Sequence, residues 1–385
     1  MIQVEDKHDC CGCTACASIC GKKAIVMQPD GEGFLYPVCD LSRCIGCHLC
    51  EQVCPIVARD SKQSDISPLK VYALRNKNAE ILRSSSSGGA FASMVDNILL
   101  QGGIIYGAEY NEQHVVVHRG ETTSDGAIRF RGSKYVQSNI NGAYNEIRQH
   151  LLSGRYVLFS GTPCQVEGLK RFLRRSYENL LTVDILCHGV PSPQIFADYI
   201  RFINKYSPGR LKGLFMKDKT FGWGYQNTRL FFQRGRSEFN TPLSNLWNNI
   251  YYDHIVNRPS CHKCRFTNLH RPGDLTIGDF WGIEKYHKEF HSSMGVSLLM
   301  TNTTKGNIFW EQIKLEFEYI ESNTEECIQP VLQHSRLEPF DRISFWEEYK
   351  KLGFDKTIRR RYHITHAALL KNYLYQIINN TRWLN

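Results

Sequence analysis

Short apolar runs alternate with amphipathic stretches along most of the chain after residue 70. A brief apolar run bounded by polar residues or glycine is typical of a strand, whereas apolar positions three and four residues apart are typical of a helix. Strands are expected at 71–74, 104–108, 115–118, 155–160, 180–186 and 275–278, and helices at 89–100, 143–152, 166–173, 193–205, 243–256 and 304–315. This alternation predicts an α/β domain with a mixed sheet over residues 71–330.

The two ends of the chain have a different pattern. Apolar runs at 24–27 and 34–38 flank the turn sequence Pro-Asp-Gly-Glu-Gly, which predicts a hairpin within a small α+β domain at 1–60. Residues 61–70 are largely polar and lack periodicity, so we expect a linker there. Residues 331–385 are charged and aromatic, and we expect them to form a basic helical tail.

Two cysteine runs in the first domain repeat one another with the spacing C-x₂-C-x₂-C-x₃-C. The first run is Cys10, Cys13, Cys16 and Cys20, and the second is Cys44, Cys47, Cys50 and Cys54. The spacing resembles that of bacterial two-cluster ferredoxins, in which three close thiolates hold one [4Fe–4S] cube and the fourth crosses to the other cube. One cube would then take Cys10, Cys13, Cys16 and Cys54, and the other Cys44, Cys47, Cys50 and Cys20.

Two features bear on this assignment. A zinc site or a disulfide framework is the alternative, but zinc sites use paired C-x₂-C steps rather than triplets. Pro55 follows the second run, whereas Gly21 stands where the first run would have its proline. That departure leaves the expected ligands unchanged.

The cysteines and the chain length bound the class of protein. The chain has 385 residues, 42% of them apolar, which suffices for two domains with globular cores. Ten of the 15 cysteines lie in the first 54 residues, eight of them at cluster spacing, and oxidation would destroy such ligands, so a reducing cytoplasm is expected. No stretch approaches the roughly 18 uninterrupted apolar residues of a membrane helix, and the first residues lack a signal-peptide core.

The formal net charge of +9 does not by itself indicate nucleic-acid binding. A [4Fe–4S]²⁺ cube with four thiolates carries about −2, so two cubes remove about four units and three remove about six. No nucleic-acid partner is expected, because basic patches do not alternate with regularly spaced aromatics. The tail's basic run is usually a solvated helix face, and contact with an acidic partner or an anionic membrane is the alternative. Its members are Lys350, Lys351, Lys356, Arg359, Arg360 and Arg361.

Four further cysteines predict a second site. Cys164 and Cys187 each follow an expected strand, and Cys261 and Cys264 form a C-x₂-C pair. Ligand loops of open α/β sheets gather at the carboxyl ends of strands, so these four thiols could meet in a third metal site. Buried structural cysteines are one alternative, and a zinc knuckle that adds His262 or His270 is another.

A run of serines and glycines precedes the helix expected at 89–100. Free backbone N–H groups, hydroxyl donors and the positive end of the helix dipole suit a phosphate there, although an ordinary helix cap is the alternative. The chain has neither a dinucleotide-binding G-x-G-x-x-G nor a P-loop. The run is Ser85, Ser86, Ser87, Gly88 and Gly89.

Together these segments resemble the coenzyme F-420 hydrogenase/dehydrogenase beta subunit family, with a two-cluster ferredoxin domain fused in front. The blocks that carry the resemblance are 85–89, 134–138, 161–165, 187–192, 258–264 and 274–282. The resemblance implies a flavin, FAD or FMN, beside a third [4Fe–4S] cube held by Cys164, Cys187, Cys261 and Cys264. It also implies a flavin pocket formed by the serine–glycine run with Lys134, Gln137, Ser138 and Thr162, with Asp279 and Trp281 in the same cavity.

These parts predict an iron–sulfur flavoprotein oxidoreductase. A flavin exchanges hydride and a cube moves single electrons, so the pair would connect an organic substrate with an electron-carrier protein such as ferredoxin. His188, Lys134 and Asp279 are the candidate proton donors. The alternative is a non-catalytic electron relay or adaptor subunit of a larger redox or polysaccharide-biosynthesis assembly. A homo-oligomer is compatible with either, and nothing in the sequence identifies the substrate or a deazaflavin pocket.

Overall fold

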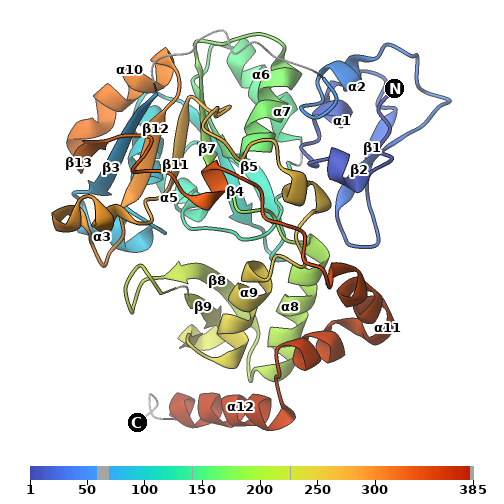
Figure 1. Ribbon diagram of the computed structural model, residues 1–385, viewed down its shortest axis with the longest axis vertical. Helices are drawn as coiled ribbons and strands as arrows, with labels where there is room; N and C mark the ends of the chain where they lie inside the picture. Colours follow the sequence, from blue (N-terminus) through green and yellow to red (C-terminus); the bar gives the residue numbers. More distant parts are fainter. Residues whose placement is uncertain (59–68, 141, 226, 382–385) are drawn as a thin grey trace.

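The computed structural model describes residues 1–58, 69–140, 142–225 and 227–381, which form three packed units (Figure 1). A small N-terminal unit lies beside the helices of a large sheet, and a second α/β unit with the C-terminal helices lies below that sheet in the view. Residues 61–68 of the expected linker lie outside the described residues. Within the described residues, no helix is both long and apolar enough to cross a membrane.

The N-terminal unit contains α1 (Ala15–Ile19), β1 (Ile25–Pro29), β2 (Leu35–Cys39) and α2 (Leu49–Gln52). β1 and β2 are antiparallel, with Ile25 opposite Cys39, as the apolar runs predict. The Asp30 side chain closes the turn between them by accepting hydrogen bonds from the backbone N–H groups of Glu32 and Phe34, each at 3.0 Å. The expected hairpin is therefore present.

The large sheet has the strand order β13-β3-β12-β11-β7-β6-β4-β5. β4, β6, β7 and β11 run parallel to their neighbours in this group, while the remaining pairings are antiparallel, so the sheet is mixed as predicted. Its strands are β3 (Lys70–Asn76), β4 (Ile104–Tyr110), β5 (Val116–Glu121), β6 (Val157–Gly161), β7 (Leu180–Ile185), β11 (Leu275–Asp279), β12 (Ser297–Thr301) and β13 (Phe317–Ser322). β12 and β13 were not expected from the apolar pattern.

Helices cover both faces of this sheet. Along β6, Val157 and Phe159 are buried in one apolar cluster and Leu158 in another, because successive side chains of a strand point to opposite faces. α6 (Ala143–Leu152) and α7 (Pro163–Leu173) contribute to the first cluster, and α4 (Ala90–Leu100) and α10 (Thr304–Ile313) to the second. The short helices α3 (Ala79–Ser84) and α5 (Ser124–Ala127) complete this unit.

The lower unit is built from two distant parts of the chain. The first part contains α8 (Pro193–Tyr206), β8 (Leu211–Asp218), β9 (Asn227–Phe232), β10 (Ser237–Glu238) and α9 (Pro242–Tyr252), and the second contains α11 (Arg342–Arg361) and α12 (His366–Thr381). Phe345, Trp346 and Leu369 of the second part are buried in the same cluster as Trp247 of the first. The expected tail is helical, but it helps to form a core. The strands β8 to β10 were not predicted.

The N-terminal unit is docked firmly against the rest of the chain. Cys13, Ala15 and Val53 are buried among α6 and α7 side chains. On its other side, both carboxylate oxygens of Glu32 accept hydrogen bonds from the Arg342 guanidinium in a buried ion pair. This packing places the first cysteine loop beside Cys164, at the start of α7.

Candidate functional site

The two cysteine loops of the N-terminal unit have the same backbone conformation. Gly12 and Gly46, at equivalent motif positions, have φ of +71° and +67°. Thr14 and His48, two residues further on, have φ of +65° and +57°. Left-handed residues on either side of a cysteine turn backbone N–H groups into a common concavity, which suits an anion such as a thiolate-ligated cube. The sequence repeat is therefore also a structural repeat.

The thiols of the N-terminal unit form two electrostatic groups. Burial, followed by the neighbouring Cys10 and Cys54 thiols, raises the pKa of Cys16 to about 12. Cys13 interacts with Cys16 and Cys54, so this group consists of Cys10, Cys13, Cys16 and Cys54. In the other group, Cys20, Cys44 and Cys50 surround Cys39, and Cys47 of the same loop is exposed. Crowded thiols of this kind are costly to ionise unless a metal shares their charge.

Cys164, Cys187, Cys261 and Cys264 also converge. Cys164 lies in the first turn of α7, Cys187 follows β7, and Cys261 lies in a 3₁₀ turn over Pro259–Lys263. Burial and the Cys164 thiol raise the pKa of Cys187 to about 12 and that of Cys264 to about 11. The four cysteines line a cavity of about 170 Å³. Among the described residues, no three His, Cys, Asp or Glu side chains converge closely enough to hold a single metal ion.

Cys11 lies between the N-terminal thiols and this second set. Its thiol is within hydrogen-bonding reach of Cys13 on one side and Cys164 on the other. Cys11 is outside the ligand spacing, and the sequence did not mark it. Its position shows that the first cysteine group and the Cys164 group are neighbours.

A larger cavity of about 580 Å³ adjoins the small one, and Cys187, His188 and Arg336 line both. It opens at the carboxyl ends of β6, β7 and β11 and extends to Tyr251 and Tyr252 of α9. Its volume falls within the roughly 300–1,000 Å³ of cofactor and ligand sites. Gly89, Ala90 and Phe91 place the N-terminus of α4 in its wall, and Gly89 provides no side-chain cap for the free N–H groups. Free N–H groups at a helix start suit a phosphate-bearing ligand.

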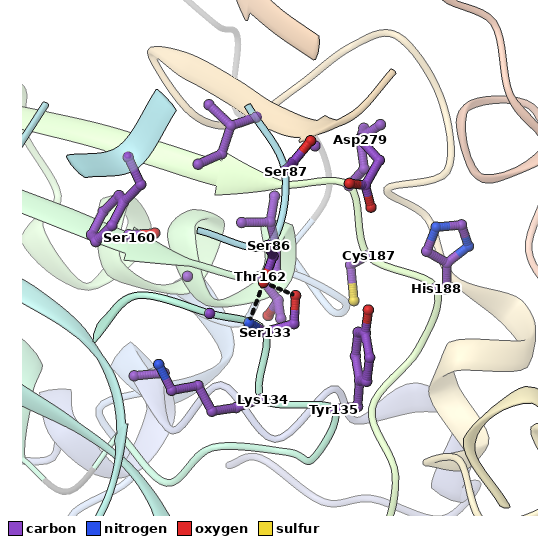
Figure 2. A pocket seen from close by; sticks show the side chains of 18 of the residues that line it. Ser86, Ser87, Ser133, Lys134, Tyr135, Ser160, Thr162, Cys187, His188 and Asp279 are labelled. Carbon is purple, nitrogen blue, oxygen red and sulfur yellow. Dashed lines mark hydrogen bonds between the residues drawn. The ribbon is translucent and has the colours of Figure 1, made fainter. Parts of the chain in front are cut away.

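The serine–glycine run lies at this cavity, but its hydroxyls have protein partners. The Ser86 hydroxyl oxygen accepts hydrogen bonds from the Ser133 backbone N–H at 2.8 Å and the Ser133 hydroxyl at 3.1 Å (Figure 2). The Ser85 hydroxyl donates to Ile81 O and the Ser87 hydroxyl to Val296 O. Ligand contacts from this run are therefore left mainly to the backbone at the start of α4.

Two residues expected in the flavin pocket lie outside the cavity wall. Gly88 packs against the large sheet, where its N–H donates to the Ser297 hydroxyl at 2.8 Å. The Gln137 side chain donates to Cys11 O at 3.1 Å, so it contacts the N-terminal unit. Lys134, Ser138 and Thr162 do line the cavity. The sequence block 134–138 could not give the direction of the Gln137 side chain.

The three candidate proton donors do not converge. His188 interacts electrostatically with Asp279, whereas Lys134 interacts with Glu109, and Figure 2 shows Lys134 at the opposite side of the cavity from the other two. Burial lowers the pKa of Lys134 to about 7, and its ammonium donates to Arg129 O and Arg131 O, both at 2.8 Å. Burial also lowers the pKa of His188, which keeps its ring neutral at pH 7.

Asp279 is held by partners that the sequence did not indicate. Its carboxylate pairs with the buried Lys217 ammonium at 2.5 Å and accepts a hydrogen bond from Trp223 Nε1 at 2.9 Å. Trp223 stacks on Trp281, with ring centroids 4.3 Å apart and planes 7° apart. Lys217 and Trp223 belong to the unpredicted β8 and the loop after it. Asp279 therefore connects the large sheet with the lower unit.

Comparisons with known proteins agree with both parts of the expected resemblance. Residues 9–58 match the family model of the 4Fe-4S dicluster domain, and residues 154–326 match that of the C terminus of the coenzyme F420 hydrogenase/dehydrogenase beta subunit. The chain therefore carries one segment similar to each of these two families, in that order. No curated protein matches the chain.

One solved structure similar to this chain belongs to the F420-reducing [NiFe] hydrogenase complex from Methanosarcina barkeri, studied as a xenon derivative. The two chains are 16% identical, with a TM-score of 0.45 over 79% of this chain and 94% of the other. A likeness this distant carries no functional argument.

Proposed function

We propose that the chain is an iron–sulfur flavoprotein oxidoreductase that passes electrons between an external carrier protein and an organic substrate. The observation that most directly supports this proposal is the wall formed by Cys187 and His188, which two cavities share. The cavity lined by Cys164, Cys187, Cys261 and Cys264 lies on one side of it, and the larger cavity lies on the other. A cube held by these thiols would be next to any ring bound in the larger cavity.

The exposure of the cysteines supports a path from the surface inward. Cys47 is exposed, whereas Cys13 and Cys16 are buried, and Cys11 connects Cys13 with Cys164. A carrier protein would therefore meet the Cys44–Cys50 group first. Electrons would then pass to the Cys10–Cys16 group and on to the Cys164 group. Close, buried and rigidly held carriers favour one-electron transfer along such a path.

A flavin supplies the exchange of one hydride for two single electrons and a proton. The residues of this chain would bind and orient it. The start of α4 would receive its phosphates, Thr162 and Ser138 would face its body, and Trp281 would cover part of the opening. His188 stands where the two cavities meet, so its ring is the side chain best placed to hold a proton between them. Burial lowers the pKa of Lys134, at the other side of the cavity, to about 7, so Lys134 is a second candidate for proton transfer.

Iron and flavin content test this proposal on the full chain, reconstituted without oxygen. Three cubes give about twelve irons per chain and two give about eight. Cys261→Ser should lose about four irons, while Cys327→Ser, at a buried cysteine in an apolar cluster of the sheet, should lose none. Flavin absorbance should accompany the full iron content. A chain that holds its full iron content but no flavin would contradict the proposal that the protein is a flavin-dependent enzyme.

A relay without chemistry of its own is the second candidate. The observation that favours it is the engagement of polar groups, because Ser86, Ser87 and Asp279 all have protein partners. Such a relay would hold its cubes but turn over no substrate. Steady-state reduction of a small-molecule acceptor by the isolated chain would rule it out.

A further inference from the structure

Arg258 is a charged residue with no exposed surface, and it reaches from the loop before Cys261 into the N-terminal unit. Its Nε donates to Cys10 O at 2.6 Å and its Nη2 to Leu35 O at 2.9 Å. The same Nη2 lies 3.4 Å from the Cys10 sulfur, in hydrogen-bonding position. One guanidinium therefore contacts both the backbone and the thiol of an expected cube ligand.

Gln137 completes this contact from a second element. Its Oε1 accepts a hydrogen bond from Arg258 Nη1 at 3.0 Å, and its Nε2 donates to Cys11 O at 3.1 Å. A β-carbon at Gly12 would lie 2.7 Å from both Arg258 Nη1 and Gln137 Nε2. The loop over Cys10–Gly12 is thus held so closely that only glycine fits at position 12.

Within the part of the chain that the structure describes, no carboxylate pairs with the charge of Arg258. Guanidinium stays protonated, and a buried charge is costly without an opposite charge. Among the ion pairs between described residues, none involves Arg258. Its neighbours are the Tyr36 ring at 4.3 Å, the Phe34 ring at 5.4 Å and the Cys10 sulfur. A thiolate that ligates an anionic cube is the counter-ion that this arrangement lacks.

We propose that Arg258 is a positioning residue that raises the reduction potential of the cube held by Cys10 and fixes its place beside the Cys164 site. One electron from the carrier changes the charge of a thiolate-ligated cube from about −2 to about −3. A fixed positive charge and an N–H donor at sulfur stabilise the more negative state. This inference rests on the cubes of the proposed function but not on the flavin.

The test is a redox titration of the reconstituted full chain. The electron paramagnetic resonance signals of the reduced cubes monitor the titration. Arg258→Gln should make the reduction of one cube at least tenfold less favourable. This change lowers the midpoint potential of that cube by about 59 mV for one electron and leaves the potentials of the other cubes unchanged. Arg265→Gln is the matched control. Arg265 also reaches the N-terminal unit, donating to Ile56 O at 2.8 Å, but it makes no hydrogen bond to a thiol of the described residues.

A second variant keeps the test decisive if Arg258→Gln loses iron. Gln137→Glu nearly preserves the side-chain shape and brings a negative charge against the Arg258 guanidinium, so it should lower the same midpoint. If the variants hold their full iron content and their midpoint potentials are unchanged, the proposed role of Arg258 is wrong, while the proposed function still stands. A wild-type chain that takes up iron but no flavin would contradict the proposed enzyme and leave this inference intact. A chain that takes up no iron would contradict both.

Discussion

Gly168 of α7 faces Cys13 so closely that a β-carbon at position 168 would lie 2.9 Å from both the sulfur and the β-carbon of Cys13. A helix in the sheet unit is therefore shaped to receive an expected cube ligand of the N-terminal unit. The fit joins the two units at the place where electrons would cross between them.

Gly168→Ala should displace Cys13 and weaken the cube that it ligates. Overpacking in a buried contact costs about 1–3 kcal/mol, so the free energy of unfolding should fall by that amount although alanine favours the helix. Iron should fall by up to about four atoms per chain. Gly21→Ala is the control, because no atom lies within 4 Å of a β-carbon there. Unchanged iron content and unchanged stability in Gly168→Ala would contradict this prediction, because they would mean that Cys13 can move away from the new β-carbon at no cost.

Asp279→Asn should destabilise the protein because it leaves the Lys217 ammonium buried without its counter-ion. The Lys217 side chain is only 2% exposed, and breaking a buried ion pair on one side costs about 3 kcal/mol. Urea unfolding would measure the loss. Lys314→Met breaks a pair between Lys314 and Glu311 at the surface and should change stability by less than about 0.5 kcal/mol. Equal effects in the two variants would argue that Asp279 has no structural role.

The buried His118 should make stability depend on pH. Burial lowers its pKa from 6.5 to about 4 in the folded chain, while its Nε2 donates to Ser160 O at 3.0 Å. Between these values the unfolded chain binds a proton that the folded chain does not, so stability is lost as the pH falls through this window. From pH 7 to pH 5.5 the loss due to His118 should be about 1 kcal/mol.

Comparison of the wild type with His118→Gln isolates that contribution from the carboxyl groups. The variant should be less stable at pH 7 but lose about 1 kcal/mol less on acidification to pH 5.5. Urea unfolding at the two pH values measures both quantities. Parallel pH profiles for the two proteins would show that His118 does not titrate as its burial requires.

Trp346→Ala in α11 should destabilise the lower unit by about 3–5 kcal/mol, because the indole is buried in a core shared with α8 and α9. Ile343→Ala, in the same helix but 73% exposed, should change stability by less than about 0.5 kcal/mol. Thermal unfolding would compare the stability of the two variants.

The basic residues of the C-terminal helices are partly neutralised, since Arg361 pairs with Asp253 and Asp341. This pairing reduces the charge available for a membrane surface.

The sequence indicated most elements of the large sheet and the candidate cysteine ligands. It indicated much less of the small unit below the sheet. The apolar run of β12 could have been read from the pattern, whereas β8 and β9 carry polar residues such as Lys217 and Asn227 that became buried only through their partners. In the same way, the apolar side of α11 had no visible partner, because α8 and α9 lie about a hundred residues or more earlier in the chain.

The cysteine spacing by itself predicts which thiols can share a cube, because three ligands within one short loop must lie on one concave surface. The apolar pattern likewise determined the alternation from which the mixed sheet forms. Only the tertiary structure decided that Cys11 faces Cys164, that Arg258 reaches Cys10 and that Asp279 pairs with Lys217. These contacts depend on how separate units dock, and docking is governed by the fit of whole surfaces, which no local spacing records.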